Sequence, residues 1–261
     1  MIDTIVPFIG KYMPEINTAL GAGLVIFARA LGFVRFSPVF NRSEITGIVK
    51  LSIALILTII LTGILKPPMP ETGVSLTYSL ILNFAAGALL GFIANCILQA
   101  IEAAGDMINM QMGLSSAMVL DPSTSSQVSI VGKFFTLLAV ILFIHVGGVY
   151  WLIRGLMKSF EIFPVYATTF PLEQLINQKF LITLTSNVLY IGLQIASPVL
   201  LATLGQDIIL GIISKTAPQI NVFQLSFLFK PVLGATIMIF ILPLIMETIM
   251  EYFNSYGSLF G

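Results

Sequence analysis

Long uninterrupted runs of apolar residues constrain this chain more than any other feature of its sequence. Six runs stand out, at residues 19–40, 48–65, 76–98, 134–153, 181–213 and 232–250. A bilayer core about 30 Å thick is crossed by roughly 20 helical residues, and most of the runs have that length. Because lipid leaves every backbone polar group to be satisfied within the chain, the runs predict helices. Strands of a membrane barrel would instead alternate apolar and polar residues.

The composition excludes most other classes of protein. Of the 261 residues, 57% are hydrophobic and only 9% are charged, whereas about 25% are charged in an ordinary soluble domain. Disordered chains are poor in apolar residues. The twelve basic residues cancel the twelve acidic ones, so the chain lacks the excess of basic residues that is typical of a nucleic-acid-binding protein. The sequence therefore predicts an all-α, membrane-derived protein.

The fifth run is too long for one straight span. Pro198 and the step at residues 205–207 interrupt it, and proline lacks the N–H that an inner helical position donates. This predicts a bent helix or two pieces near Pro198. Proline-rich or polar connectors separate the other helices, and no repeat or low-complexity tail is present. The simplest organisation is one domain over residues 1–261, built from helical hairpins with kinked helices.

The basic residues give no membrane orientation. If the runs alternate sides, five basic residues fall on each side: Lys11, Lys66, Arg154, Lys158 and Lys179 on one, and Arg42, Lys50, Lys133, Lys215 and Lys230 on the other. Conventional multispan proteins concentrate Lys and Arg on the cytoplasmic side. The equal number of basic residues on the two sides argues against a conventional multispan bundle.

The residue types that carry enzyme chemistry are scarce. Cys96 is the only cysteine and His145 the only histidine, so an internal disulfide and a Cys/His metal cluster are excluded. Glu102 and Asp106 share a helix face, but the sequence shows no activated nucleophile and no phosphate-binding glycine loop beside them. We therefore predict no enzymatic activity, no cofactor and no metal.

Two features indicate close contacts between helices. Arg29 lies in the middle of the first run, where a charge costs several kcal/mol in lipid unless it is paired or faces protein. We expect Arg29 to contact a partner subunit or an aqueous lumen. The alternatives are that its charged end reaches the membrane surface, or that it pairs with an acidic residue of the same chain. Gly87 and Gly91 form a small-xxx-small pair, which lets helices approach closely. That face packs within the chain or forms a subunit interface.

A methionine- and glycine-rich segment is the most informative part of the sequence. Methionine is unbranched and adaptable, so it fills irregular gaps without fixing one shape, and glycine allows bends. A re-entrant or lumen-facing loop is the structure that this mixture favours, and the alternative is that the methionines fill gaps in the core.

At this segment the chain resembles a known family. Glu102-x-x-Gly105-Asp106-x-Ile108-x-x-Gln111-Met112-Gly113, followed by Asp121-Pro122, looks like the signature of the FliR family of flagellar type III export-gate subunits. Further similar elements follow in order along nearly the whole chain: Phe27-Ala28-Arg29, Ser37-Pro38-Val39, Ser159-Phe160 with Pro164, Ala196-x-Pro198-Val199, and residues 217–223, which read Ala-Pro-Gln-Ile-Asn-Val-Phe.

The chain departs from the family pattern at two places. Members often carry an aromatic residue at the position of Ser116, and an Asn-Gly-His element near residues 147–150, where this chain reads Gly-Gly-Val-Tyr. No special role therefore passes to His145.

The resemblance implies a non-enzymatic pore component. In the family, one FliR assembles with five FliP and four FliQ subunits into a tapered helical complex, and FlhB associates with its cytoplasm-facing side. The gate sits in the basal body, largely above the plane of the bacterial inner membrane, and passes exported flagellar proteins. The methionine-rich segment matches the plug loop of the family, which implies a seal over residues 105–122, and Arg29, Gly87 and Gly91 are candidate subunit contacts. The candidate residues of the seal are Gly105, Met107, Met110, Met112, Gly113, Ser116 and Met118.

Three other functions stay open at this level. Injectisome gate subunits share the architecture, although residues 111–113 and 217–223 favour the flagellar branch. A secondary transporter would use a broken helix at Pro198 and Asp207 and would show inverted repeats, which we do not find. An intramembrane enzyme would need a partner group for Glu102 and Asp106 that the sequence does not supply.

Overall fold

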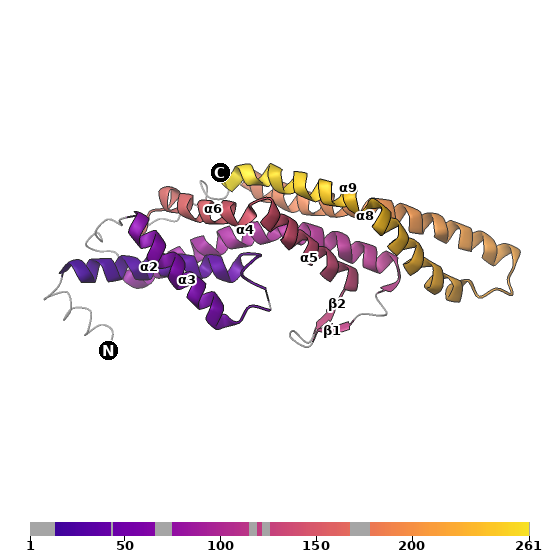
Figure 1. Ribbon diagram of the computed structural model, residues 1–261, viewed down its shortest axis with the longest axis horizontal. Helices are drawn as coiled ribbons and strands as arrows, with labels where there is room; N and C mark the ends of the chain where they lie inside the picture. Colours follow the sequence, from indigo (N-terminus) through magenta and orange to yellow (C-terminus); the bar gives the residue numbers. More distant parts are fainter. Residues whose placement is uncertain are drawn as a thin grey trace. The chain divides into compact units, whose positions relative to one another are not determined.

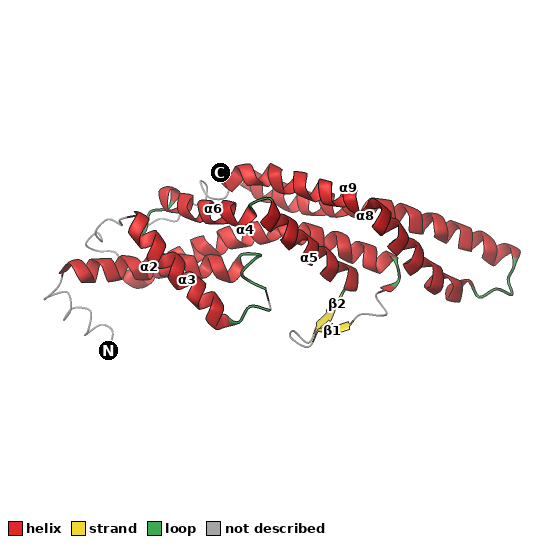
Figure 2. Ribbon diagram, in the orientation of Figure 1, coloured by secondary structure: helices red, strands yellow, loops and turns green. Residues whose placement is uncertain are grey.

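The computed structural model describes residues 14–42, 44–65, 75–114, 119–121, 126–167 and 178–260. Within these residues the chain is helical apart from one short strand pair, which confirms the all-α prediction (Figure 1, Figure 2). The helices are α2 (Pro14–Phe36), α3 (Gly47–Leu65), α4 (Leu76–Gln111), α5 (Ile130–His145), α6 (Gly148–Ile162), α8 (Gln178–Thr216) and α9 (Val222–Phe260).

The described residues form two compact units. The first lies within Met1–Asn95 and Val149–Phe180, and the second lies within Cys96–Gly148 and Leu181–Leu259. Helix α4 therefore begins in the first unit and ends in the second. A single domain over the whole chain stays a prediction, since contacts within each unit do not decide whether the two fold together.

In the first unit, α2 presents one continuous stripe to the core. Its fully buried residues recur at helical spacing: Ala22, Val25, Ile26, Arg29, Ala30 and Phe33. Helix α3 packs on α2, and α6 adds Leu152 and Leu156 to the same core.

In the second unit, the remainder of α4 packs with α5, α8 and α9. Small residues bring α4 and α8 together, since a Cβ on Gly192 would lie 3.3 Å from the carbonyl oxygen of Ala100. The rings of Phe143 on α5 and Phe253 on α9 meet edge to face, with centroids 5.3 Å apart. Both rings are buried, so this contact is part of the core.

The run predicted at residues 134–153 is not one helix. Helix α5 ends at His145 and α6 begins at Gly148. Gly147 has φ +85°, a backbone conformation that glycine adopts at no steric cost, and so it ends the first helix. A Cβ on the next residue, Gly148, would strike the ring of Phe143. The two adjacent glycines therefore make the break.

The sequence predicted a bent helix or two pieces near Pro198. In the described structure α8 is one helix that continues through Pro198. Proline cannot donate to the carbonyl oxygen four residues earlier, which belongs to Gln194. The hydroxyl of Ser197 donates to that oxygen at 2.9 Å instead. Helix α9 contains Pro231 and Pro243 and is bent along its length in Figure 1, as expected of prolines inside long helices.

Four of the described helices are long and apolar enough to span a membrane: α3, α4, most of α8 and most of α9. A fifth span results if α5 and α6 are counted together. Most of α3 is exposed, including Ile48 and Ile59. A soluble monomer rarely exposes continuous apolar surface of this extent, so lipid or protein covers it.

Candidate functional site

The methionine-rich segment is helical over its first half. Helix α4 ends at Gln111, and one more helical hydrogen bond follows, from the amide of Met112 to the carbonyl oxygen of Ile108 at 2.9 Å. The prediction of a loop is therefore wrong for residues 105–111. The apolar face of the long preceding helix continues through Ile108, and this continuity outweighs the glycine at position 105.

The chain turns at Gly113, as the sequence predicts. Its φ is +74°, in the left-handed region that glycine adopts most easily. Ser116 and Met118 lie outside the residues whose side chains the structure describes. The strands β1 (Val119–Asp121) and β2 (Ser126–Val128) then pair antiparallel, a small hairpin that the apolar runs did not indicate.

Gly105 is a packing residue rather than a hinge. A Cβ placed on it would lie 2.9 Å from the carbonyl oxygen of Val131 and 3.0 Å from the Cβ of Phe135. Helix α5 begins at this contact, and the hydroxyl of Ser129 caps it by accepting a hydrogen bond from the amide of Gly132 at 2.8 Å. The first turn of α5 is therefore fixed against α4, which is the opposite of a movable joint.

The methionines of the segment differ in exposure. Met112 is 3% exposed, and its side chain occupies the space above Gly234 of α9, where a Cβ would lie 2.6 Å from its Cγ. Met107 is half-buried. Met110 is 69% exposed, so of these three it is the methionine most available to another surface.

Asn109 is a feature of this segment that the sequence reasoning missed. It is 1% exposed, and in the described part of the chain neither Oδ1 nor Nδ2 has a hydrogen-bond partner. It lies four residues after Gly105, so helical spacing places both on the face that meets other helices. That spacing is the sequence signal that would have found it.

Arg29 is buried in the first unit, with a relative exposure of 0%. Its guanidinium donates through Nε and Nη2 to Asn83 Oδ1, at 3.0 and 2.5 Å. It also donates to the carbonyl oxygen of Ser159 at 2.9 Å and to that of Phe163 at 2.6 Å. The ring centroid of Phe160 lies 3.9 Å from Cζ, which adds a cation–π contact.

These contacts decide between the expectations for Arg29. Its partners are neutral groups of its own chain, so the internal acid is not what the structure shows. Nε, Nη1 and Nη2 all donate to groups of the first unit, so the guanidinium is satisfied within its own chain, and a contact with a partner subunit stays a prediction. The carbonyl groups lie at the C-terminal end of α6, where a cation is favourable to the helix dipole.

Asn83 extends the same network. Its Nδ2 donates to the carbonyl oxygens of Ser79 at 2.8 Å and Val165 at 3.0 Å. Arg29 and Asn83 together connect α2, α4 and the segment that follows α6. Asn83 and the segment that follows α6 both lie far from Arg29 in the sequence, so no local pattern indicates that they are its partners.

Gly87 and Gly91 pack against α2 of the same chain. A Cβ on Gly87 would collide with the carbonyl group of Arg29 and lie 2.9 Å from the amide nitrogen of Phe33. A Cβ on Gly91 would lie 2.7 Å from the carbonyl oxygen of Phe33. Gly32 on α2 meets α4 in the same way. The close-approach prediction agrees with this packing, but the partner is an internal helix rather than another subunit.

The remaining polar candidates do not assemble a reactive site. Glu102 and Asp106 are both exposed, and within the described residues no group of three His, Cys, Asp or Glu side chains is placed to hold a metal ion. Asp207 forms an ion pair with Lys230, at 2.7 Å. Since α8 is continuous there, the broken-helix site of a transporter is not present in this part of the chain.

Comparison with known proteins places the chain among bacterial export proteins. The family described as "Bacterial export proteins, family 1" matches residues 20–256. The "Flagellar biosynthetic protein FliR" of Pectobacterium carotovorum subsp. carotovorum is 30% identical over 84% of this chain and 83% of its own length. The FliR of Bacillus subtilis is 28% identical over 93% and 94%. The "Surface presentation of antigens protein SpaR" of Shigella flexneri is 27% identical over 90% and 88%.

Proposed function

The chain belongs to the bacterial export proteins, family 1, and from this premise we propose that it is the FliR-type subunit of a flagellar type III export gate. It forms part of the channel through which flagellar proteins leave the cytoplasm. The observation that carries the proposal is the match over nearly the full length of both chains, at 93% and 94% for the Bacillus subtilis FliR.

The flagellar branch is better supported than the injectisome branch. The FliR relatives reach 30% and 28% identity, against 27% for SpaR of Shigella flexneri. The difference is small, but it agrees with the flagellar-type elements at residues 111–113 and 217–223. An injectisome gate subunit is the alternative.

The proposed partners are FliP and FliQ in one hetero-oligomeric gate, FlhB at its cytoplasmic side, the exported flagellar proteins, and membrane lipid. The extent of exposed apolar surface supports partners of this kind. Phe223, Phe240 and Ile239 of α9 are each more than two-thirds exposed, and such faces require a protein or lipid cover. The place of assembly is the flagellar basal body in the bacterial inner membrane.

The proposed mechanism is passive sealing, without catalysis, cofactor or metal. A protein-export pore has to retain ions and small solutes while no substrate is present, and apolar constrictions do so by dewetting. The end of α4 with its exposed Met110, the turn at Gly113 and the following hairpin form the proposed seal, which includes Met107, Met112, Ser116 and Met118. The helical part of the proposed seal, up to Gln111, is held against α5 and carries Met107 and Met110.

The intact mass of the detergent-extracted particle tests the proposal. A gate subunit is extracted in a stable particle together with several other proteins, so the mass of the particle exceeds by far the 28.3 kDa of residues 1–261. A transporter would be extracted alone or as a homo-oligomer. A homogeneous monomer that catalyses substrate flux would overturn the proposal.

A further inference from the structure

The methionines in the described part of the chain differ in exposure, and one of them stands apart from the rest. Met110, in the last turn of α4, is 69% exposed. The other six of the described part are buried or half-buried: Met107, Met112, Met157, Met238, Met246 and Met250. A dissolved oxidant reaches an exposed sulfur directly, whereas packing shields a buried one, and the product in both cases is methionine sulfoxide.

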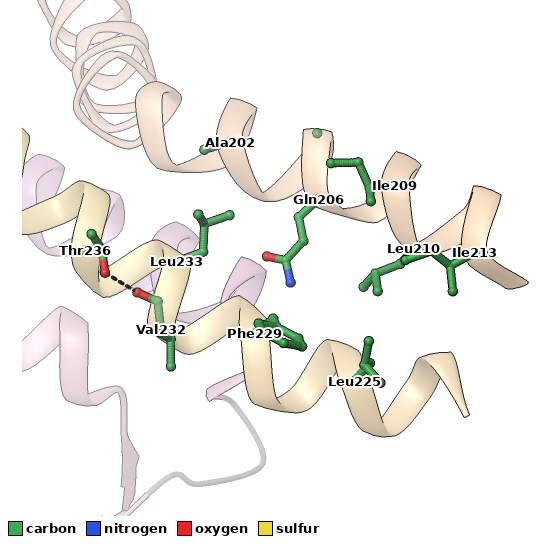
Figure 3. A pocket seen from close by; sticks show the side chains of 11 residues that line it. Ala202, Gln206, Ile209, Leu210, Ile213, Leu225, Phe229, Val232, Leu233 and Thr236 are labelled. Atoms are coloured by element: carbon green, nitrogen blue, oxygen red, sulfur yellow. Dashed lines mark hydrogen bonds between the residues drawn. The ribbon is translucent and has the colours of Figure 1, made fainter. Parts of the chain in front are cut away.

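Met112, two residues after Met110, shows how the fold protects a methionine. It is 3% exposed, and its Cγ, Sδ and Cε atoms all lie within 3.1 Å of the position of a Cβ on Gly234 of α9. Figure 3 shows the neighbouring Leu233 of α9 lining a groove together with residues of α8. An ion pair between Asp207 and Lys230 joins the same two helices. Helix α9 is therefore held over Met112, and an oxidant reaches that sulfur only when the packing opens.

Hydrogen peroxide converts a thioether into a sulfoxide without a further reagent. One peroxide oxygen forms a bond to Sδ, the O–O bond breaks, and the second oxygen takes up the hydrogen of the first and leaves as water. The sulfur is oxidised by two electrons, and the peroxide is reduced by two. The product side chain is polar and chiral, whereas the thioether is apolar and flexible.

Oxidation has different structural consequences at the two positions. The exposed side chain of Met110 has room for the added oxygen, so the fold of α4 is kept. Met112 already fills the space above Gly234, so an added oxygen would push α4 and α9 apart and would bury a polar atom. Met110 is therefore the position at which oxidation changes the chemistry of the surface and leaves the packing intact.

We propose that Met110 is an oxidation site for hydrogen peroxide, and that its sulfoxide makes the proposed seal permeable to small solutes. The proposal rests on the export function proposed above. An apolar constriction excludes ions by dewetting, and a sulfoxide oxygen binds water, so one added oxygen atom weakens the barrier. Met112 is spared because α9 covers it.

Oxidation mapping of the assembled particle tests the first half of the proposal. The particle is treated with hydrogen peroxide at concentrations that leave it intact, and mass spectrometry of its peptides locates each sulfoxide by a mass increase of about 16 Da, one oxygen atom. Met110 is expected to be half oxidised before the other described methionines, while Met112 stays reduced. Faster oxidation of Met112 overturns the proposal. So does an unreacted Met110, which would show that a partner subunit covers it.

A solute-leakage assay with two variants of Met110 tests the second half. Met110→Leu keeps an apolar side chain of similar size without sulfur, and Met110→Gln places a polar amide where the sulfoxide would stand. Assembled particles are reconstituted into vesicles filled with a small dye, and leakage is compared before and after peroxide. Peroxide should raise leakage severalfold in the wild type and leave Met110→Leu at its own starting rate. Without peroxide, Met110→Gln should leak severalfold faster than Met110→Leu.

Met112→Leu is the matched control, with the same substitution two residues away on the same helix. It should keep the peroxide-dependent rise in leakage. A rise that persists in Met110→Leu, or one that is lost in Met112→Leu, overturns the proposal. The oxidation map of the wild-type particle needs no variant, so it remains decisive if a variant fails to fold.

The mass of the extracted particle separates this proposal from the proposed function, since it does not depend on the state of Met110. If a particle of several proteins forms and peroxide does not raise its leakage, the oxidation proposal is wrong and the export function stands. If the chain is extracted alone, the proposed function is wrong, and the oxidation proposal is wrong with it.

Discussion

A Cβ atom placed on Gly105 would lie 2.8 Å from the Cα atom of Gly132, so α4 and the first turn of α5 meet backbone to backbone. The carboxylate of Asp106 occupies the position where a Cβ of Gly132 would stand. Each glycine thus makes room for a group of the other helix. The helical start of the proposed seal is therefore joined to α5 by contact rather than by a flexible link.

Gly105→Ala should destabilise the protein by about 1–3 kcal/mol through this overpacking, even though alanine favours a helix by about 1 kcal/mol. Gly63→Ala is the matched control, because Gly63 lies inside α3 with no atom within 4 Å. It should be neutral or slightly stabilising. Thermal unfolding of both variants in the same detergent measures the difference. Equal melting temperatures would show that the contact relaxes freely.

Gly87→Leu should prevent α2 from packing on α4, since its side chain would meet the backbone of Arg29 and Phe33. The loss should appear in the chain expressed without partner proteins, as a drop in monodisperse yield. Gly23→Leu on α2, where a Cβ meets no atom within 4 Å, is the control. If Gly87→Leu had a normal monodisperse yield without partner proteins but reduced the yield of the assembled particle, this face would be a subunit interface.

Arg29→Leu should destabilise the first unit by at least about 3 kcal/mol, because it leaves several buried acceptors without donors. Arg29→Lys should rescue only part of this, since an ammonium group cannot span the acceptors from Asn83 to Phe163. Ser159→Ala removes a hydroxyl that accepts from Arg29 at 3.2 Å and donates to the carbonyl oxygen of Leu156 at 2.6 Å, and should cost about 1–3 kcal/mol. Unfolding midpoints rank the three variants. A stable Arg29→Leu chain that fails to assemble would favour the intersubunit contact.

Met110→Ala and Met112→Ala should have different effects. Met110 is exposed, so its truncation should leave stability unchanged and raise the leakage of small solutes through assembled gates. Met112 is buried against Gly234, and its truncation should cost about 2–5 kcal/mol through the cavity. Solute leakage and thermal unfolding are measured for each variant. Two results together would make the segment a core element. Leakage would stay at the wild-type level in Met110→Ala, and a chain lacking residues 107–112 would fail to assemble.

Asn109→Leu should stabilise the protein by about 1–3 kcal/mol, because it replaces a buried amide without partners by an apolar side chain of similar size. Met107→Leu, in the same helix, provides a comparison without a polar group. Thermal unfolding gives the stability, and motility of cells carrying each variant gives the function. A destabilised Asn109→Leu would show that the amide is hydrogen-bonded, for example to an ordered water.

The sequence predicted the helices because apolar runs and prolines are local signals. It missed the break within residues 134–153, although Gly147 and Gly148 mark it, since a glycine can serve either a turn or a close contact. The same ambiguity made Gly105 look like a hinge, while Gly113 is one of the described glycines with positive φ. The partners of Arg29 lie 54 and 130 or more positions away, and no periodicity encodes such pairs.

The order in which the ribosome releases these residues gives the Arg29 network a consequence for biogenesis. The first unit is interrupted by residues 96–148, which belong to the second. Until Ser159, Phe163 and Val165 emerge, the guanidinium and Asn83 lack acceptors that they hold in the finished fold. A nascent chain stopped before residue 159 therefore carries an incompletely satisfied cation among apolar helices. Such a fragment should therefore be less stable in the membrane than the completed chain.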